Sequence, residues 1–360
     1  MELSVASRKV ARKGRNSDFD LTRSRTFKGS ALLVVSALGI AACGASTTKP
    51  DSASKTDITA TRPTSAKPSV PTTTTTQPTN PVFATGPFAV NTEDADWTDA
   101  SRATPANHGA AGHGGRKLPT RIYLPVTDTG TPIPGPHPMF VWVHGLDATV
   151  DYFDPLLRGW AARGYVVVAP TFPLTHTGVP GGPKFDDYVN QPADVSYVIS
   201  QVLADDGPQG THRPGLIDPT RIAVGGHSLG AATTIGLTAN QCCIDTRVRA
   251  AIEIDGKSLA FSGAGPKERA VPVLMIHGDA DTTFDVSESR NRYAAAPAPK
   301  FLVILRGIPH TPFRIPAARA VIVASVGDFL DAYLEQQPGS LNRLATDVAA
   351  SPIATLTSDP

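Results

Sequence analysis

Cysteine and net charge are both scarce in this sequence, and each scarcity excludes a class of protein. Only three cysteines occur in 360 residues, Cys43, Cys242 and Cys243, which is too few for a disulfide framework. They show no Cys or His spacing that is typical of a zinc site. The formal net charge is +1, so the sequence indicates no basic face for nucleic acid. We therefore expect no metal, no cofactor and no nucleic-acid partner.

The apolar run near the N-terminus, residues 31–42, is too short to cross a bilayer as a helix. It follows a stretch rich in Arg and Lys, an order that is typical of a signal peptide. The run ends in Leu-Gly-Ile-Ala-Ala-Cys, which resembles the lipobox of bacterial lipoproteins. That resemblance implies cleavage before Cys43 and attachment of a diacylglycerol to its thiol; an ordinary secretory signal is the alternative. We expect residues 1–42 to be a signal peptide and Cys43 to anchor an extracytoplasmic protein to the bacterial cell membrane.

Composition divides the rest of the chain into a tether, a folded body and a tail. Residues 43–86 are largely Thr, Ser, Pro, Lys and Ala, with too little apolar surface to offset the entropy lost on folding. We expect them to form a disordered tether. Residues 87–337 carry the apolar runs of a core and predict one folded domain, which we expect to be a monomer. Residues 338–360 return to Thr, Ser, Ala and Pro and predict a loose tail.

Short apolar runs rich in β-branched residues alternate with helix-length segments in this body. The runs lie at 121–126, 139–144, 165–170, 221–225, 250–255, 271–277 and 301–306. The helix-length segments include 152–163, 192–204, 229–240 and 317–336. This alternation predicts an α/β fold with a mostly parallel central sheet and helices on both faces. On such a sheet, catalytic side chains lie at the carboxyl ends of the strands.

The sequence Gly226-His227-Ser228-Leu229-Gly230 directly follows one of these strands and precedes a helix-like run. Strand, tight turn and helix in this order form the context of a nucleophile elbow, which presents a serine hydroxyl at a helix N-terminus. There the free N–H groups and the helix dipole favour negative charge. A glycine-rich turn without chemistry is the alternative. We predict that Ser228 is a catalytic nucleophile.

A serine nucleophile needs a base, and that base needs a third group to orient it. The histidines downstream of Ser228 are His277 and His310. His310 follows the last expected strand through a short turn, so we predict that it is the base. His277 ends a strand just before a turn, and we predict that it is a packed residue.

The orienting acid has three candidates among the aspartates that follow these strands. Asp281 lies in the turn Gly278-Asp-Ala-Asp-Thr, after the strand at 271–277, and it is the predicted acid. Asp255 ends the preceding strand and is the alternative acid. Asp279 shares the turn with Asp281 and is the third candidate. The carboxylates that do not orient the base are expected to cap turns or to support the site.

Acyl transfer places negative charge on a carbonyl oxygen, which two backbone N–H groups commonly stabilise. We expect one from Leu229, which follows the nucleophile, and one from Leu146, which follows His144-Gly145 after an early strand. A plain strand-ending turn is the alternative for Leu146. The interval between Asp255 and Val271 is too short for a cap domain, so we expect an open cleft. The loop at 172–192 is the predicted wall of that cleft.

The residues quoted above resemble a known group of enzymes over residues 117–334. The segment that begins Lys117-Leu-Pro-Thr-Arg, the Gly-His-Ser-Leu-Gly elbow and Gly307-Ile-Pro-His-Thr-Pro-Phe are similar to bacterial dienelactone-hydrolase-like and platelet-activating-factor-acetylhydrolase-like α/β-hydrolases. Polyester hydrolases and cutinases are near neighbours of this group. The Asn190-Gln-Pro-Ala-Asp-Val helix start also fits it. The resemblance implies an α/β-hydrolase fold and esterase chemistry, although dienelactone hydrolases carry cysteine where this chain has Ser228.

These observations predict a serine carboxylester hydrolase that acts through an acyl-enzyme intermediate. Its substrates would be small esters, or lipid or phospholipid acyl esters. An acyltransferase on the same fold, or a catalytically inactive lipoprotein that binds lipid or cell wall, are the alternatives. The adjacent Cys242 and Cys243 leave two states open, a vicinal disulfide or two half-buried free thiols, and we favour the thiols.

Overall fold

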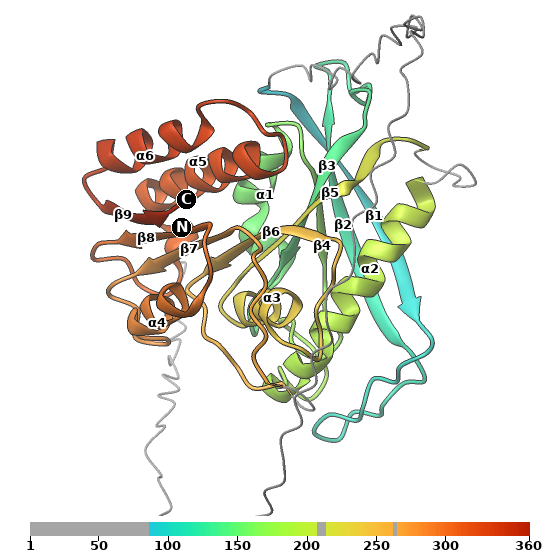
Figure 1. Cartoon of the computed structure of the whole chain (residues 1–360). Coiled ribbons are helices and arrows are strands. Elements are labelled where there is room, and N and C mark those ends of the chain that lie inside the picture. Colours follow the sequence, from blue (N-terminus) through green and yellow to red (C-terminus); the bar gives the residue numbers. More distant parts are fainter. Residues whose placement is uncertain (1–85, 207–213, 262–264) are drawn as a thin grey trace, which may run out of the picture. The chain divides into compact units, whose positions relative to one another are not determined.

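A nine-stranded β-sheet runs through the part of the chain that the computed structural model describes, residues 86–206, 214–261 and 265–360 (Figure 1). Its strands are β1 (Ala89–Asp99), β2 (Arg116–Val126), β3 (His137–Val143), β4 (Val166–Pro170), β5 (Ile217–His227), β6 (Val248–Ile254), β7 (Val273–Gly278), β8 (Lys300–Leu305) and β9 (Ala354–Asp359). Their order across the sheet is β1-β2-β4-β3-β5-β6-β7-β8-β9. Each strand expected from the sequence is present, and β1 and β9 are additional edge strands.

The six central strands, from β4 to β8, are parallel to one another, whereas β1, β2 and β9 pair in antiparallel fashion. Every residue of β4 and β7 is buried, which explains why these strands read as unbroken apolar runs instead of alternating patterns. The predicted mostly parallel α/β sheet is therefore confirmed. Its central carboxyl ends carry the loops that contain the expected site residues.

Helices cover both faces of this sheet. They are α1 (Asp154–Ala161), α2 (Gln191–Asp206), α3 (Leu229–Ala239), α4 (Ser287–Ala295), α5 (Pro316–Tyr333) and α6 (Ser340–Ala350), with short 3-10 helices η1 (Val150–Phe153), η2 (Phe185–Asn190) and η3 (Pro312–Arg314). Side chains of α1, α5 and α6 share one buried cluster with one face of the strands. Side chains of α2, α3 and α4 pack on the other face, in two further clusters. The predicted two-sided covering is confirmed.

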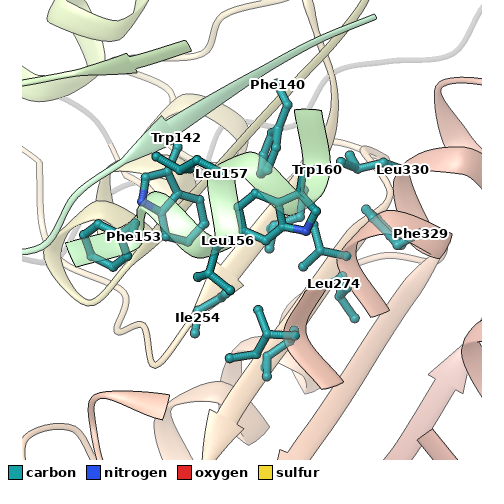
Figure 2. Close-up of a cluster of buried hydrophobic side chains, with 14 of the residues drawn as sticks. Phe140, Trp142, Phe153, Leu156, Leu157, Trp160, Ile254, Leu274, Phe329 and Leu330 are labelled. Atoms are coloured by element: carbon teal, nitrogen blue, oxygen red, sulfur yellow. The ribbon is translucent and has the colours of Figure 1, made fainter. Parts of the chain in front are cut away.

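An aromatic cluster fixes the chain that follows β3. Trp142 from β3 packs against Phe153 of η1 and Trp160 of α1, with ring centroids 5.3 Å apart in both pairs (Figure 2). Phe140 meets Trp160 edge-on at 5.1 Å, a geometry that aromatic rings favour. The loop that starts at His144 is thus held at both ends by buried rings.

The predicted loose tail at 338–360 is wrong. Residues of α6 cover the core, where Leu344 and Val348 are buried, and β9 extends the sheet antiparallel to β8. The abundance of Ala, Thr and Ser suggested low complexity, but the apolar residues at 341, 344 and 348 recur at helical spacing and form one packing face. The folded domain therefore continues to Asp359.

The expected signal peptide (1–42), Cys43 and most of the tether (43–86) lie outside the described residues. Among the residues that the structure does describe, no helix has the length and apolarity needed to span a bilayer.

Cys242 and Cys243 form a vicinal disulfide, so the favoured expectation of two free thiols is wrong for this structure. Both cysteines lie in a turn after α3, where residue 242 is exposed and residue 243 is half-buried.

Candidate active site

Ser228 occupies the sharp turn between β5 and α3. Its φ of 56° lies in the left-handed region that few L-residues adopt, and its N–H donates to the Ile254 carbonyl at 2.9 Å. A Cβ on Gly230 would lie 2.0 Å from the Val143 carbonyl oxygen, so only glycine fits where the helix start meets β3. The local sequence thus produces the strained serine backbone of a nucleophile elbow, with Ser228 only 8% exposed.

His310 connects the Ser228 hydroxyl to the Asp281 carboxylate. Its Nε2 lies 2.8 Å from Ser228 Oγ, and its Nδ1 lies 2.6 Å from Asp281 Oδ2. The other carboxylate oxygen of Asp281 accepts the N–H groups of Thr283 at 2.7 Å and Phe284 at 3.0 Å. These amide bonds fix the carboxylate, and the carboxylate fixes the tautomer of His310 with its proton on Nδ1. Nε2 is then left to accept the hydroxyl proton.

Burial lowers the pKa of His310, and the neighbouring His227 lowers it further, while Asp281 acts in the opposite direction. The lowered pKa keeps the imidazole neutral at neutral pH, as a general base requires. His227 is itself buried, which lowers its pKa to about 4. Its Nε2–H donates to the His310 carbonyl at 2.6 Å, so it holds the backbone of the loop that carries His310.

The two other candidate acids contact different groups. Asp255 has a φ of 45°, and its Oδ1 accepts the Gly278 N–H at 2.9 Å. Its Oδ2 lies 3.6 Å from His227 Nε2 and has no hydrogen-bond partner among the described residues. Burial raises the pKa of Asp255 to about 7. Asp279 is exposed and accepts the N–H of Gly307 at 2.6 Å, as a turn cap would.

His277 is fully buried beneath the acid, in the packed position expected of it. Its Nδ1 lies 2.6 Å from Ser289 Oγ, and its Nε2 donates to the Phe284 carbonyl at 2.9 Å. The same Nε2 lies 3.3 Å from Asp281 Oδ2. His277 therefore fixes the loop whose amides hold the Asp281 carboxylate.

The loop after β3 reaches the other side of Ser228. A Cβ on Gly145 would lie 3.2 Å from Ser228 Cβ, so the loop packs against the serine at the residue that precedes Leu146. Leu229 is the first residue of α3, so its N–H has no acceptor within the helix. The structure thus brings the loop that carries Leu146 against Ser228, and Leu229 follows Ser228 directly at the start of α3.

His144 was noted in the sequence only as part of the His-Gly pair, but it braces this loop. Its Nε2 accepts the Phe172 N–H at 3.1 Å, and its Nδ1–H donates to the Gly145 carbonyl at 2.8 Å. Burial lowers the pKa of His144 to about 4, so it stays neutral and keeps both bonds. Apart from its place in the His144-Gly145 pair, nothing in the sequence distinguishes a histidine that holds a turn in this way.

The loop at 172–192 was expected to form a wall of the cleft. It contains η2 and lies against the oxyanion loop, since the Thr175 carbonyl accepts the Asp147 N–H at 2.8 Å. Phe172, Leu174 and Val179 also line a cavity of about 260 Å³ that none of Ser228, Asp281 and His310 lines.

A serine hydroxyl, imidazole and carboxylate on a parallel sheet of this topology define an α/β-hydrolase. Residues 79–286, more than half of the chain, match the model of the family described as Chlorophyllase. The chain belongs to that family, and it is a carboxylester hydrolase. The fold also resembles that of a ferulic acid esterase from Streptomyces cinnamoneus, with a TM-score of 0.58 and 22% identity over 75% of this chain and 97% of that one. No curated protein matches the chain. The α/β-hydrolase esterase expected from the sequence is confirmed at this level.

Proposed function

We propose that this protein hydrolyses carboxylic esters through a Ser228 acyl-enzyme. His310 Nε2 takes the hydroxyl proton as Ser228 Oγ attacks the ester carbonyl carbon. The N–H groups of Leu146 and Leu229 stabilise the oxyanion, and His310 then donates its proton to the departing alcohol oxygen. Water deprotonated by His310 attacks the acyl-enzyme, which releases the acid and restores Ser228. The observation that carries this proposal is the pair of His310 contacts, 2.8 Å to Ser228 and 2.6 Å to Asp281.

Asp281, rather than Asp255, is the acid of this proposal. Asp281 is the carboxylate in direct contact with the ring nitrogen of His310, whereas the nearest interaction of Asp255 Oδ2 with an imidazole is the 3.6 Å approach to His227. A carboxylate whose pKa burial raises to about 7 is also partly protonated at neutral pH, and it stabilises an imidazolium less well than an ionised one.

The substrate class that the surroundings favour is an ester with an apolar group, such as a small apolar ester or a lipid or phospholipid acyl ester. Leu146, in the loop after β3, is 37% exposed, and Tyr152, next to Phe153 in η1, is 41% exposed. The described parts of the β6–β7 connection contain no helix, which supports an uncapped cleft. A p-nitrophenyl ester series tests this, and kcat/KM should rise from acetate to longer acyl chains. A phospholipid run in parallel separates lipid from simple esters.

The place of action that the sequence favours is the outer face of the bacterial cell membrane, with lipidated Cys43 as the anchor. Labelling of growing cells with radioactive palmitate tests it. Label should enter the wild-type chain and be lost in Cys43→Ala; label retained in that variant would contradict the anchor.

A fluorophosphonate probe tests the nucleophile, because only an activated serine displaces its fluoride and becomes phosphonylated. The wild-type chain should be labelled and Ser228→Ala should not, while Ser200→Ala, an exposed serine of α2, serves as the matched control and should be labelled in full. A wild-type chain that takes no label and cleaves no ester would contradict the proposed function.

A further inference from the structure

Gln191 is a fully buried amide at the first position of α2, within the Asn-Gln-Pro-Ala-Asp-Val helix start. Both ends of the amide are engaged. Its Oε1 accepts the hydroxyl of Thr233 at 2.5 Å, and its Nε2 donates to Thr175 Oγ1 at 2.8 Å. Thr175 and Thr233 are themselves fully buried. A buried amide that is satisfied in this way is held in one orientation, because an unpaired end would cost its desolvation.

Thr175 continues this connection to the oxyanion loop. Its main-chain carbonyl accepts the N–H of Asp147 at 2.8 Å, and the hydroxyl of Thr177 donates to the Asp147 carbonyl at 2.6 Å. Asp147 has a φ of 54°, a left-handed conformation that persists only where the surroundings enforce it. Leu146 thus lies between two fixed residues, with Gly145 packed on Ser228 and Asp147 tied to the Thr175 segment.

Thr233 continues the connection to the nucleophile helix. It lies one turn after Leu229 in α3, and its Oγ1 is also 3.1 Å from the Leu229 carbonyl oxygen. Gln191 therefore joins two segments distant in sequence. The first segment contains Thr175, whose carbonyl accepts the N–H of Asp147, the residue after Leu146. The second segment is α3, which contains both Thr233 and Leu229.

We propose that Gln191 is a positioning residue that sets the separation of the Leu146 and Leu229 N–H groups, and so the geometry of the oxyanion hole. This inference rests on the proposed function of Ser228. Oxyanion donors act because they are fixed before charge develops, and a small displacement of such groups lowers the rate steeply. Gln191 does not contact Ser228, His310 or a reacting atom, so its effect passes through the loop and the helix that it joins.

A purely structural role would lower stability without changing the chemistry of the folded enzyme, so the readouts must separate the two. Gln191→Leu keeps the approximate volume and removes both hydrogen bonds. Gln201→Leu, at a half-buried position further along α2, is the matched control. Both proteins are assayed well below their measured unfolding midpoints, so that only folded enzyme is compared.

For Gln191→Leu we expect kcat on a p-nitrophenyl ester to fall by about ten- to a hundredfold, with KM changed less than about twofold, since a misplaced donor weakens transition-state rather than ground-state binding. Affinity for an aryl trifluoromethyl ketone should fall by a similar factor. Ser228 Oγ adds to the ketone carbon as His310 takes the proton, which leaves an oxyanion in the hole. The pH at half-maximal kcat/KM should not move, because Gln191 lies outside the contacts of His310. Gln201→Leu should match the wild type.

Thr175→Val and Thr175→Ser provide a second pair in case Gln191→Leu does not fold. The Val variant should lose kcat and ketone affinity together, and the Ser variant, which retains the hydroxyl, should recover both. Wild-type kcat in a folded Gln191→Leu, or equal loss in both Thr175 variants, would overturn the inference while Ser228 labelling still upholds the proposed function. A wild-type enzyme that the fluorophosphonate probe does not label would overturn both the inference and the proposed function.

Discussion

The two sides of the Ser228 cleft are built from different chemistry. On the side formed by the ends of β6, β7 and β8, the polar side chains are ionisable: Asp281 and His310, with Asp255 beside them. On the side formed by the ends of β3 and β4, the polar groups are backbone amides held by neutral side chains such as His144. In the proposed mechanism, the first side moves a proton and responds to pH. The second side offers fixed dipoles whose effect is independent of pH, so damage to either side should have its own kinetic signature.

The largest effect on the ionisable side is expected from Asp281→Asn. An amide in place of the carboxylate would donate to His310 Nδ1 and favour the wrong tautomer, in which Nε2 carries the proton and cannot accept another. By analogy with other serine hydrolases, kcat should fall by about 10⁴-fold. Steady-state kinetics on a p-nitrophenyl ester measure this, with Asp279→Asn as the matched control because Asp279 only caps the turn at Gly307. Near-wild-type kcat in Asp281→Asn would reject Asp281 as the acid.

The sequence predicted the ionisable side better than the neutral one. Ser228 and His310 carry chemistry in their side chains and stand directly after apolar strands, so motif and spacing were enough to select them. The choice between Asp281 and Asp255 depended on which carboxylate reaches the ring, and both follow adjacent strands. Only the fold shows that Asp281 lies 2.6 Å from Nδ1.

Gln191 shows why the neutral side was harder to predict. Its partners lie 16 and 42 positions away along the chain, and neither partner lies on the same helix or strand as Gln191, so no local periodicity links them. The prediction of a loose tail at 338–360 was wrong for a related reason. The composition of this tail resembles a linker, and its packing on α5 becomes visible only when the few apolar residues of α6 meet the core. Local pattern identifies reactive groups, but it does not identify contacts that three distant segments make together.

A smaller effect is expected on the neutral side from Gly145→Ala. The added Cβ would lie 3.2 Å from both the His227 carbonyl oxygen and Ser228 Cβ, so the loop must shift and move the Leu146 N–H. We expect kcat to fall by about ten- to a hundredfold, less than the loss of a whole donor, with an unchanged pH profile. Gly114→Ala is the control, since its Cβ would meet nothing within 4 Å. An altered apparent pKa would mean that the two sides are coupled.

The smallest effect is expected from Asp255→Asn, which removes an ionisable group close to His310 without touching Ser228. The lowered pKa of His310 predicts that wild-type kcat/KM falls on acidification with an apparent pKa below 6.5, as the base becomes protonated. An ionised Asp255 would raise the pKa of His310 by charge attraction. Its removal should therefore shift this acid limb to lower pH and never to higher pH.

The size of that shift follows from the protonation state of Asp255. Because burial raises its pKa to about 7, Asp255 is already mostly neutral at the pH where His310 titrates, and little charge is left to remove. We expect a shift of less than about half a unit, and kcat at pH 6 within about threefold of the wild type, since Asp255 is mostly neutral there and an exchange of neutral groups changes the field at His310 only slightly. The measurement is the pH dependence of kcat/KM with a non-ionisable ester. A loss approaching that of Asp281→Asn would transfer the role of the acid to Asp255, and a shift of the limb to higher pH would refute the electrostatic reasoning for the whole ionisable side.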